Sequence, residues 1–506
     1  MKSFPDGRKQ KSHRRPVPFM KYILDSRYRF RGWHGAPYGV YDTVKRRASF
    51  FEESLYRLLM RYDAVQEIDP AAGGDRQKRF FDQMLREGIV REAGMWDFLQ
   101  EVQQYRAYPA RYRREAHWSV TGECNLKCRH CFMSAPHAKH GSPSHAQILG
   151  IVDQLAECGV FNVSITGGEP LIRSDLPEII DLLNEREIGL ETIYTNGWLV
   201  DEKFLDMLEK HHVHPGFQLS FDGIGCHDFL RGVPGAEERT VKALRLLQAR
   251  GYGVSVSMCL HRRNASSLRE TVRFLSSLGV NGLKCAAIMD LGEWQGPEAE
   301  ALRLTQEEEL SLYCDYIPEY FEDDAPLSLM LSGAFMYAPG MPQWHVAYHR
   351  ECPAEEAAET LACGVLGGVF YIGADGIVSP CQGMCDCGIA GRLDSLFNRP
   401  LREILTDSEY VKLSYLTVAD VRNGNDECRA CAWADQCTGG CRNSALIAGD
   451  NPCGVDPDAC FFFRNGWEER VREAAHPAFE RYLQRHPASA AEVQELKAEN
   501  ALPECL

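Results

Sequence analysis

The chain has 506 residues, of which 44% are hydrophobic and 25% are charged, so it has the composition of a folded globular protein with roughly two to four domains. Its formal net charge of -15 argues against a general nucleic-acid binder, because such proteins neutralise phosphates with Lys and Arg. No stretch approaches the roughly 18 apolar residues that span a bilayer, and no apolar run follows the basic N-terminus as in a secretory signal. We therefore predict a cytoplasmic protein with no nucleic-acid partner and no membrane partner.

Residues 1–35 form a basic arm. The arm contains ten Lys and Arg residues, and its only acids are Asp6 and Asp25. Such an arm either steers an acidic partner or is a solvated, disordered tail.

The patterns that follow the arm predict a small module at residues 36–96. Two short runs pair as a hairpin, two helices follow, and a short strand comes after the second helix ends at Gly88. This order suits a winged-helix-like fold, and a linker at 97–116 follows it. The segments are, in order, Tyr38–Tyr41, Ala48–Phe51, Glu53–Tyr62, Arg76–Glu87 and Ile89–Val90.

Six short apolar runs then alternate with periodic helical segments. Repeats of this spacing predict βαβ units, hence an α/β fold with a parallel sheet whose working loops lie at the carboxyl ends of the strands. The predicted strands are His117–Val120, Asn162–Thr166, Glu191–Thr195, Phe217–Phe221, Val254–Leu260 and Gly282–Ile288. The predicted helices are Ala146–Cys158, Leu176–Arg186, Glu202–His211, Glu237–Arg250 and Ser267–Leu278.

The 20 cysteines are unevenly distributed. None precedes residue 124, a tight trio follows the first predicted strand, and a dense group runs from Cys352 to Cys460. Thiols stay reduced in the cytoplasm, so this number of cysteines indicates metal ligation rather than disulfides. The distribution predicts a metal-free N-terminal module, a central catalytic domain and a C-terminal metal domain.

The trio Cys124, Cys128 and Cys131 has the spacing C-x3-C-x2-C. A loop of this length wraps three thiolates around one face of a four-iron cluster, which usually has four Cys ligands. One iron is then left open for another ligand, as in catalytic metal sites. Zinc is the alternative, although zinc sites favour paired CxxC knuckles and no second pair lies nearby.

With His130 before its last cysteine, this trio resembles the C-x3-C-x-aromatic-C signature of the radical S-adenosylmethionine (SAM) enzymes. The next predicted strand ends in a segment that resembles the GGEP motif of that family, Gly167-Gly168-Glu169-Pro170. The resemblance implies a partial (β/α)6 TIM-type barrel at 117–300 and a [4Fe-4S] cluster on the trio. It also implies that the open iron chelates SAM, whose amino group is held by the GGEP segment. Adjacent glycines let backbone approach a ligand, and Glu169 is an anion suited to an ammonium.

Later strand ends continue the resemblance. Asn196, Ser220 and Arg231 stand where the family contacts the sugar and carboxylate of SAM, and Asn264 is a weaker match. Each has a structural alternative: Asn-Gly is a common turn, and an arginine pairs with surface acids. The implied chemistry is reduction of the cluster by a flavodoxin- or ferredoxin-like donor, then reductive cleavage of SAM. The resulting 5′-deoxyadenosyl radical takes a hydrogen atom from an unactivated carbon.

The C-terminal cysteines have the spacing Cys428-x2-Cys431-x5-Cys437-x3-Cys441, followed by Cys460 and preceded by Cys363-x12-Gly376-x4-Cys381. This seven-cysteine pattern resembles a SPASM domain, which holds two auxiliary [4Fe-4S] clusters. We expect it at 351–470, after a bridging region at 301–350 and before a helical tail at 471–506. The resemblance assigns one cluster to Cys428, Cys431, Cys437 and Cys460, and the other to Cys363, Cys381 and Cys441. The fourth ligand of the second cluster is left open among Cys352, Cys385, Cys387 and Cys453, or is absent. A zinc ribbon is the alternative for the CxxC pair.

The substrate is predicted from two features. The sulfatase-maturing branch places an aspartate base directly after the cysteine equivalent to Cys381, but here Gln382 stands there, which argues against that branch. The N-terminal module resembles the element that binds the leader segment of a precursor peptide as an extra strand, with a structural cap as the alternative. The chain therefore resembles maturases of ribosomally synthesised peptides.

The reaction type stays open at this point. A thioether or carbon–carbon crosslink and an epimerisation are both compatible with the motifs, and no catalytic residue is assigned. Epimerisation needs a thiol that returns a hydrogen atom, and the candidates are Cys226, Cys259, Cys285, Cys385, Cys387 and Cys453, although spare cysteines are more often small core residues. Two further hypotheses are a radical SAM dehydrogenase, decarboxylase or maturase that acts on a small molecule or a folded protein, and a non-catalytic iron–sulfur protein.

Overall fold

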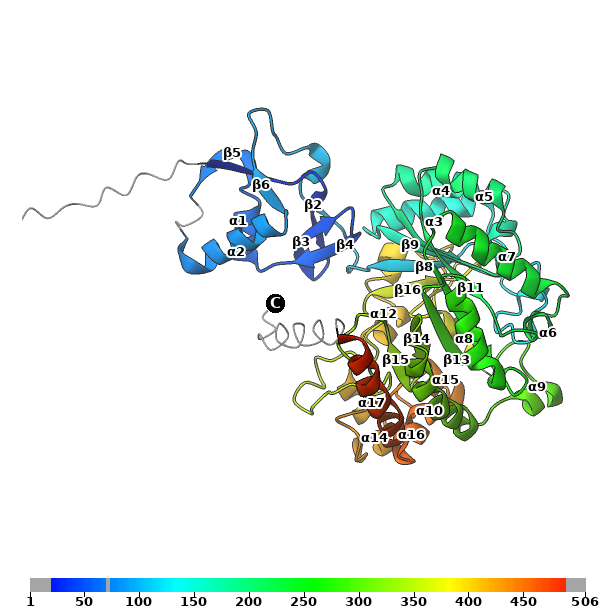
Figure 1. Cartoon of the computed structure of the whole chain (residues 1–506). Coiled ribbons are helices and arrows are strands. Elements are labelled where there is room, and N and C mark those ends of the chain that lie inside the picture. The colour runs from blue at the N-terminus through cyan, green and yellow to red at the C-terminus, as the bar shows by residue number, and fades with distance from the viewer. Residues whose placement is uncertain (1–19, 70–72, 289, 488–506) are drawn as a thin grey trace, which may run out of the picture. The chain divides into compact units, whose positions relative to one another are not determined.

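The computed structural model describes residues 20–69, 73–288 and 290–487. The chain divides into two compact units, Met1–Tyr108 and Pro109–Leu506 (Figure 1). Within the described ranges, no helix has both the length and the apolar character needed to cross a membrane. Residues 1–19, most of the predicted basic arm, lie outside the described residues, as does the end of the predicted tail from residue 488.

The N-terminal unit contains two small sheets and two helices. One sheet has the order β5-β1-β6 and is antiparallel, and the other has the order β4-β3-β2-β7. Its core buries Tyr22, Phe30, Tyr56 and Phe81. The elements are β1 Met20–Leu24, β2 Tyr28–Trp33, β3 Ala36–Asp42, β4 Arg47–Phe50, α1 Glu53–Leu59, β5 Asp63–Ile68, α2 Gly74–Arg86, β6 Val90–Glu92, a 3-10 turn at Glu101–Gln103 and β7 Arg106–Ala107.

The predicted hairpin is confirmed as β3 and β4, and the two predicted helices are confirmed as α1 and α2. The predicted boundary at residue 35 differs from the structure, because β1 and β2 place residues 20–33 inside this unit. Ile23 and Leu24 of β1 and Phe30 of β2 are buried in this unit, and the charged side chain of Arg31 is buried with them. The winged-helix assignment itself stays a prediction.

A ten-stranded sheet organises the second unit, in the order β15-β14-β13-β12-β11-β10-β9-β8-β16-β17. The six predicted strands are confirmed as a parallel array, and β9 and β12 begin and end at the predicted residues. The strands are β8 Glu115–Ser119, β9 Asn162–Thr166, β10 Gly189–Thr195, β11 Gly216–Ser220, β12 Val254–Leu260, β13 Gly282–Ala287, β14 Ser328–Leu331, β15 Phe335–Tyr337, β16 Val369–Ile372 and β17 Val378–Ser379.

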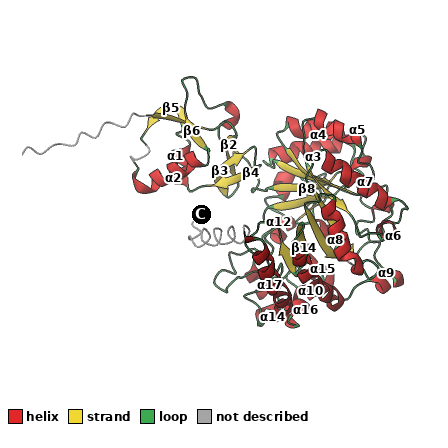
Figure 2. Cartoon of the chain, viewed as in Figure 1, coloured by secondary structure: helices red, strands yellow, loops and turns green. Residues whose placement is uncertain are grey.

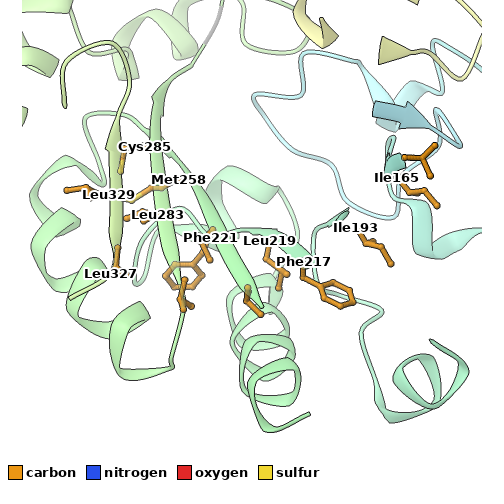
Figure 3. Packing of buried hydrophobic residues seen from close by; sticks show 14 of the residues in the cluster. Ile165, Ile193, Phe217, Leu219, Phe221, Met258, Leu283, Cys285, Leu327 and Leu329 are labelled. Carbon is orange, nitrogen blue, oxygen red and sulfur yellow. The ribbon is translucent and has the colours of Figure 1, made fainter. Parts of the chain in front are cut away.

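Helices cover the outer side of this curved sheet (Figure 2). They present apolar faces to the alternate strand residues that point outward, and Figure 3 shows Ile193, Leu219 and Met258 in that layer. The helices are α3 His145–Glu157, α4 Leu176–Glu185, α5 Glu202–Lys210, α6 His227–Arg231, α7 Ala236–Ala249, α8 Leu268–Ser277, α9 Pro297–Leu302 and α10 Gln306–Glu322.

The cysteine-rich C-terminal region is continuous with the barrel. Its first two strands join the barrel sheet, because β16 pairs in parallel with β8 and β17 pairs with β16. The predicted bridging region likewise adds α10, β14 and β15 to the same unit. The remaining helices are α11 Leu401–Ile404, α12 Glu409–Ser414, α13 Val418–Asn423, α14 Asp426–Arg429, α15 Arg442–Gly449, α16 Pro457–Arg464 and α17 Trp467–Arg485.

Candidate active site

The loop that carries Cys124, Cys128 and Cys131 follows β8 and is held along both edges by backbone hydrogen bonds. On one edge, Gly168 N donates to Thr121 O at 2.8 Å and Glu169 N donates to Glu123 O at 2.9 Å. A Cβ on Gly168 would lie 2.1 Å from Glu123 O, so only glycine permits this approach. The GGEP segment therefore lines the cysteine loop directly.

The other edge of the loop contacts the end of α6. Lys127 N donates to Arg231 O at 3.2 Å, and Arg129 N donates to Leu230 O at 2.9 Å. A Cβ on Gly232 would lie 2.1 Å from Lys127 O, which explains glycine at that position. The loop is thus fixed by segments that follow the second and fourth parallel strands.

The three thiols suit a metal. Leu126 N donates to Cys124 Sγ at 3.4 Å, Ala135 N to Cys131 Sγ at 3.3 Å, and Arg231 Nη1 to Cys128 Sγ at 3.7 Å. Burial, followed by Glu169 and the other two thiols, raises the pKa of Cys124 to about 12. A thiolate in such a place requires a cation, and metal binding supplies one while it releases the proton.

Glu169 connects two strand ends. It is fully buried, and its carboxylate accepts hydrogen bonds from Thr195 Oγ1 at 2.7 Å, Asn196 N at 2.8 Å and Leu171 N at 3.1 Å. Burial raises its pKa to about 7 against these hydrogen bonds. Glu169 thereby holds the end of β10 beside the cysteine loop, and its contact with a SAM ammonium stays a prediction.

A buried ion pair lies where β11 ends. Arg231 Nε donates to Asp222 Oδ2 at 2.8 Å, and the same oxygen lies 3.1 Å from His227 Nδ1. Although burial acts the other way, Arg231 and His227 hold the pKa of Asp222 below its usual range. Arg231 is therefore not the surface arginine of the structural alternative. Its buried guanidinium contacts both the Asp222 carboxylate and the Cys128 thiol.

His130 lies beside this pair as a neutral ring. Burial and the neighbouring Arg231 lower its pKa to about 3, and its Nδ1 is buried without a hydrogen-bond partner. One ring nitrogen of His130, one carboxylate oxygen of Asp222 and the Cys259 sulfur all lie within 4.8 Å of one another. Because Asp222 is already paired with Arg231, we do not assign a separate metal to this group. The unpartnered nitrogen leaves a polar atom available to a bound nucleoside.

The other two predicted SAM contacts also lie at strand ends. Asn196 Nδ2 donates to Asn125 Oδ1 at 2.8 Å and lies 3.9 Å from Cys124 Sγ, so it is adjacent to the trio. Ser220 is half-buried at the last position of β11 and pairs in register with Ser257. Asn264, the weaker match, is fully buried and donates to the Asp222 carbonyl, which is a structural role.

The inner face of the sheet is polar. On β10 to β13, alternate residues that point away from the apolar layer are half-buried or exposed, whereas a closed barrel fills its interior with apolar side chains. Gln218 Nε2 donates to Ser257 Oγ at 2.5 Å, which shows that these side chains meet across strands. Strand alternation is the sequence pattern that reveals this face, which comprises His117, Tyr194, Gln218, Ser220, Ser257, Cys259 and Lys284.

The predicted auxiliary-cluster cysteines gather in two groups. Burial, then Cys441 and Cys363, raise the pKa of Cys381 to about 12, so these three thiols are neighbours. Burial also raises the pKa of Cys460 to about 11, and Cys428 and Cys437 add to that effect. Cys431 in turn acts on Cys428 and Cys437. The two groups are those that the sequence assigned.

The cysteines that the sequence leaves open as a fourth ligand differ in their surroundings. Cys385 contacts Ser379 Oγ at 3.1 Å and interacts electrostatically with Cys381, whereas Cys387 packs in the apolar cluster that Cys381 adjoins. Cys352 packs against Ala357 and Val418, and Cys453 interacts with Arg442. Cys285 lies in the apolar core beside Leu283 and Leu329 (Figure 3). All cysteines of the described residues are free thiols.

Residues 118–275 match the model of the Radical SAM superfamily, and residues 363–432 match that of an iron-sulfur cluster-binding domain, SPASM. Mycofactocin maturase MftC of Mycobacterium tuberculosis is 26% identical over 67% of this chain and 81% of its own length. PqqA peptide cyclase of Granulibacter bethesdensis is 25% identical over 65% and 83%. AdoMet-dependent heme synthase of Nitratidesulfovibrio vulgaris is 25% identical over 66% and 89%. The solved structure of Streptococcus suis SuiB bound to precursor peptide SuiA has a TM-score of 0.59 at 18% identity, and the match covers 87% of this chain and 100% of that one.

Proposed function

We propose that this chain, a radical SAM enzyme with a SPASM domain, modifies a ribosomally synthesised precursor peptide that it binds through its N-terminal unit. Its cofactors are a SAM-binding [4Fe-4S] cluster and auxiliary iron–sulfur clusters. When bound, the cluster and SAM supply a 5′-deoxyadenosyl radical that removes a hydrogen atom from carbon. The electron for this step comes in our proposal from a flavodoxin- or ferredoxin-like donor.

The observation that carries the peptide substrate is the extent of the fold match to SuiB. Residues 109–506 make up less than four-fifths of the chain, so a match to 87% of it includes part of the N-terminal unit. SuiB is described bound to a precursor peptide, and PqqA peptide cyclase is named for a peptide. A peptide substrate also explains a separately folded unit that contains none of the chain's cysteines.

The N-terminal unit has the means to bind an extended segment. Among the described residues, β5 and β6 are the outer strands of the three-stranded sheet, and edge strands accept a further strand through main-chain hydrogen bonds. Exposed apolar side chains follow β6: Met95 is 88% exposed, Trp96 86% and Phe98 71%. We propose that the leader segment of the precursor binds as an added strand and that its apolar residues contact this stretch.

The predicted site residues, all in the second unit, have the following roles in this proposal. Cys124, Cys128 and Cys131 hold the cluster, and Gly167, Gly168, Glu169 and Pro170 form the wall against which the SAM amino group binds. Arg231, fixed by Asp222, places positive charge beside Cys128, where it favours the thiolate and the carboxylate of SAM. His130, Asn196 and Ser220 contact the nucleoside. The two C-terminal groups, Cys428, Cys431, Cys437 and Cys460 and Cys363, Cys381 and Cys441, hold the auxiliary clusters.

A small-molecule substrate is the alternative function. It is favoured by one observation, the comparable identity to an AdoMet-dependent heme synthase. The polar inner face of the barrel suits either kind of substrate.

Mass spectrometry tests the proposal. Each short open reading frame found beside this gene is co-expressed anaerobically with the enzyme, with a Cys124→Ala, Cys128→Ala, Cys131→Ala variant, or alone. We expect the wild-type enzyme to remove two hydrogens, or to introduce deuterium from heavy water without a change of bonding, and the variant to leave the peptide unmodified. SAM cleavage with an unchanged peptide would instead favour the small-molecule substrate.

A further inference from the structure

Four charged residues from three distant segments meet where the cysteine loop contacts the C-terminal region. Lys139 and His140 precede α3, Asp375 lies in the turn between β16 and β17, and Asp386 ends the 3-10 turn Gln382–Asp386. We call these four residues the His140 cluster. None of them belongs to a family motif, and the roles described above use none of them.

Hydrogen bonds connect the four side chains in a row. Asp375 Oδ2 lies 2.8 Å from His140 Nδ1, His140 Nε2 lies 3.1 Å from Asp386 Oδ2, and Lys139 Nζ lies 2.5 Å from Asp386 Oδ1. The side chains of His140 and Asp386 are 10% and 8% exposed, whereas that of Lys139 is 51% exposed. The row therefore runs from a buried imidazole to solvent.

The row borders a small cavity between the two cofactor regions. The cavity is lined by Phe132, Met133, His140, Tyr371, Gly373, Asp375, Gln382, Cys385 and Asp386. Phe132 and Met133 directly follow Cys131, and Gln382 follows Cys381, so chain neighbours of a predicted ligand from each region line the cavity. Gly141 O also accepts from Gly122 N at 2.7 Å, which ties the His140 segment to the start of the cysteine loop.

The charges in the row balance. Hydrogen bonds that His140 donates to Asp375 and Asp386 raise the pKa of His140 to about 9, so the imidazole carries two protons at neutral pH. His140 and Lys139 lower the pKa of Asp386 against the effect of burial. Other titratable groups near the cluster are the phenol of Tyr371 and the thiols of Cys385 and Cys387. A proton that enters at one carboxylate can pass through the imidazole to the other carboxylate, because each ring nitrogen is hydrogen-bonded to one of them.

We propose that the His140 cluster is the proton outlet of an oxidative peptide modification, with Asp375 and Asp386 as acceptors and His140 as the group that relays the proton between them to solvent. The inference rests on the proposed function and selects its oxidative branch, crosslinking or desaturation. One substrate hydrogen leaves as an atom to the 5′-deoxyadenosyl radical. The carbon radical then forms the new bond to a neighbouring sulfur, carbon or nitrogen atom. The bond between that atom and its hydrogen breaks, the proton goes to the His140 cluster, and one electron goes to an oxidant of the iron–sulfur class. The peptide loses two hydrogens in total.

Gln382 explains why carboxylates at Asp375 and Asp386 matter for proton transfer. An amide directly after Cys381 accepts no proton, and its Nε2 is directed to Met133 Sδ at 3.7 Å. Asp386 lies one short helical turn later and Asp375 lies in the adjoining hairpin, and both line the same cavity. The structure thus supplies two carboxylates where the sequence position next to the cysteine supplies none.

The test compares His140→Gln and Asp386→Asn with wild type in the full-length, reconstituted enzyme, using the precursor peptide, SAM and reductant. We expect 5′-deoxyadenosine formation to persist while modified peptide per 5′-deoxyadenosine falls at least about tenfold, since an acid–base group contributes 10²-fold or more. Asp386→Glu should restore most of the ratio. His145→Gln is the matched control, because His145 also lies between two acids, Asp175 and Glu178, but on the exposed surface.

A second measurement does not depend on the peptide. In the substrate-free enzyme, the reduction potential of the auxiliary cluster at Cys381 should vary with pH around the His140 pKa of about 9, and His140→Gln should remove that variation. Equal product ratios in wild type and both variants, or equal pH dependence, would overturn the relay. A peptide that is epimerised without loss of hydrogen would overturn it while the proposed function stands. If no peptide is modified although SAM is cleaved, the proposed function fails, and the pH dependence alone decides on the relay.

Discussion

Gly168 makes the closest contact between the GGEP segment and the cysteine loop. A methyl group there would lie 2.1 Å from Glu123 O and 3.1 Å from Cys124 N, so Gly168→Ala must displace the loop. We expect SAM cleavage to fall by about 100-fold, because a shift of roughly 1 Å in a reacting group has that effect. Quantification of 5′-deoxyadenosine under strong reductant checks this.

Gly150 provides the control for that substitution. It lies inside α3, and a Cβ there would meet nothing within 4 Å. Gly150→Ala should leave cleavage unchanged and stabilise the protein by about 0.4–1 kcal/mol. If the two variants cleaved SAM equally, the contact at Gly168 would not matter for the position of the loop.

His140 also sets a pH dependence of stability. Its pKa in the folded protein, about 9, lies above the usual 6.5, so the protonated form stabilises the native state. This contribution is complete below about pH 6.5 and is lost as the pH rises through 9. The difference in free energy of unfolding between wild type and His140→Gln, measured in urea, should therefore shrink from pH 6.5 to 9. A difference that grows over this range would contradict the ion-paired imidazolium.

At the scale of elements, α17 packs along α10. Phe479 on α17 contacts Phe321 of α10 and Tyr337 of β15, each with ring centroids 5.4 Å apart, and Arg485 Nη2 donates to Phe321 O at 2.6 Å. Because Phe479 is only 7% exposed, Phe479→Ala leaves a cavity and should destabilise the second unit by about 3–5 kcal/mol. Denaturant unfolding measures this. The exposed neighbour Glu480, changed to Ala, should have an effect within about 0.5 kcal/mol.

The elements also show how far the sequence alone leads. The predicted strands β9 and β12 match the structure to the residue, because apolar runs bounded by polar turns leave little choice of boundary. The short strands β16 and β17 were not predicted, since two to four residues carry too weak a pattern. The grouping of the motif cysteines was predicted by the resemblance to a SPASM domain. The His140 cluster was not predicted, because its members lie 235 and 246 residues apart in the chain and meet only in the folded protein, where β8 pairs with β16.

At the scale of the whole molecule, the proposed function places recognition and chemistry in separate units. Every motif cysteine lies beyond residue 108, and the N-terminal unit has a core of its own, built on residues such as Phe30, Tyr56 and Phe81. The cysteine-rich region, in contrast, shares a sheet with the barrel through β16. We therefore expect that removal of the N-terminal unit leaves the second unit folded, whereas removal of the cysteine-rich region disrupts the barrel sheet.

Deletion of residues 1–108 tests this division. The cysteine loop, the GGEP segment and the Asp222–Arg231 pair all lie in Pro109–Leu506, so the shortened enzyme should retain its iron and its cleavage of SAM. Peptide binding, measured by fluorescence anisotropy of a labelled precursor, should be lost, and with it the modification. The same precursor without its leader segment, added to the full-length enzyme, should show a comparable loss, since both changes remove the same interaction. If the shortened enzyme bound and modified the full precursor as wild type does, the N-terminal unit would be a structural cap, and substrate selection would lie in the polar interior of the barrel.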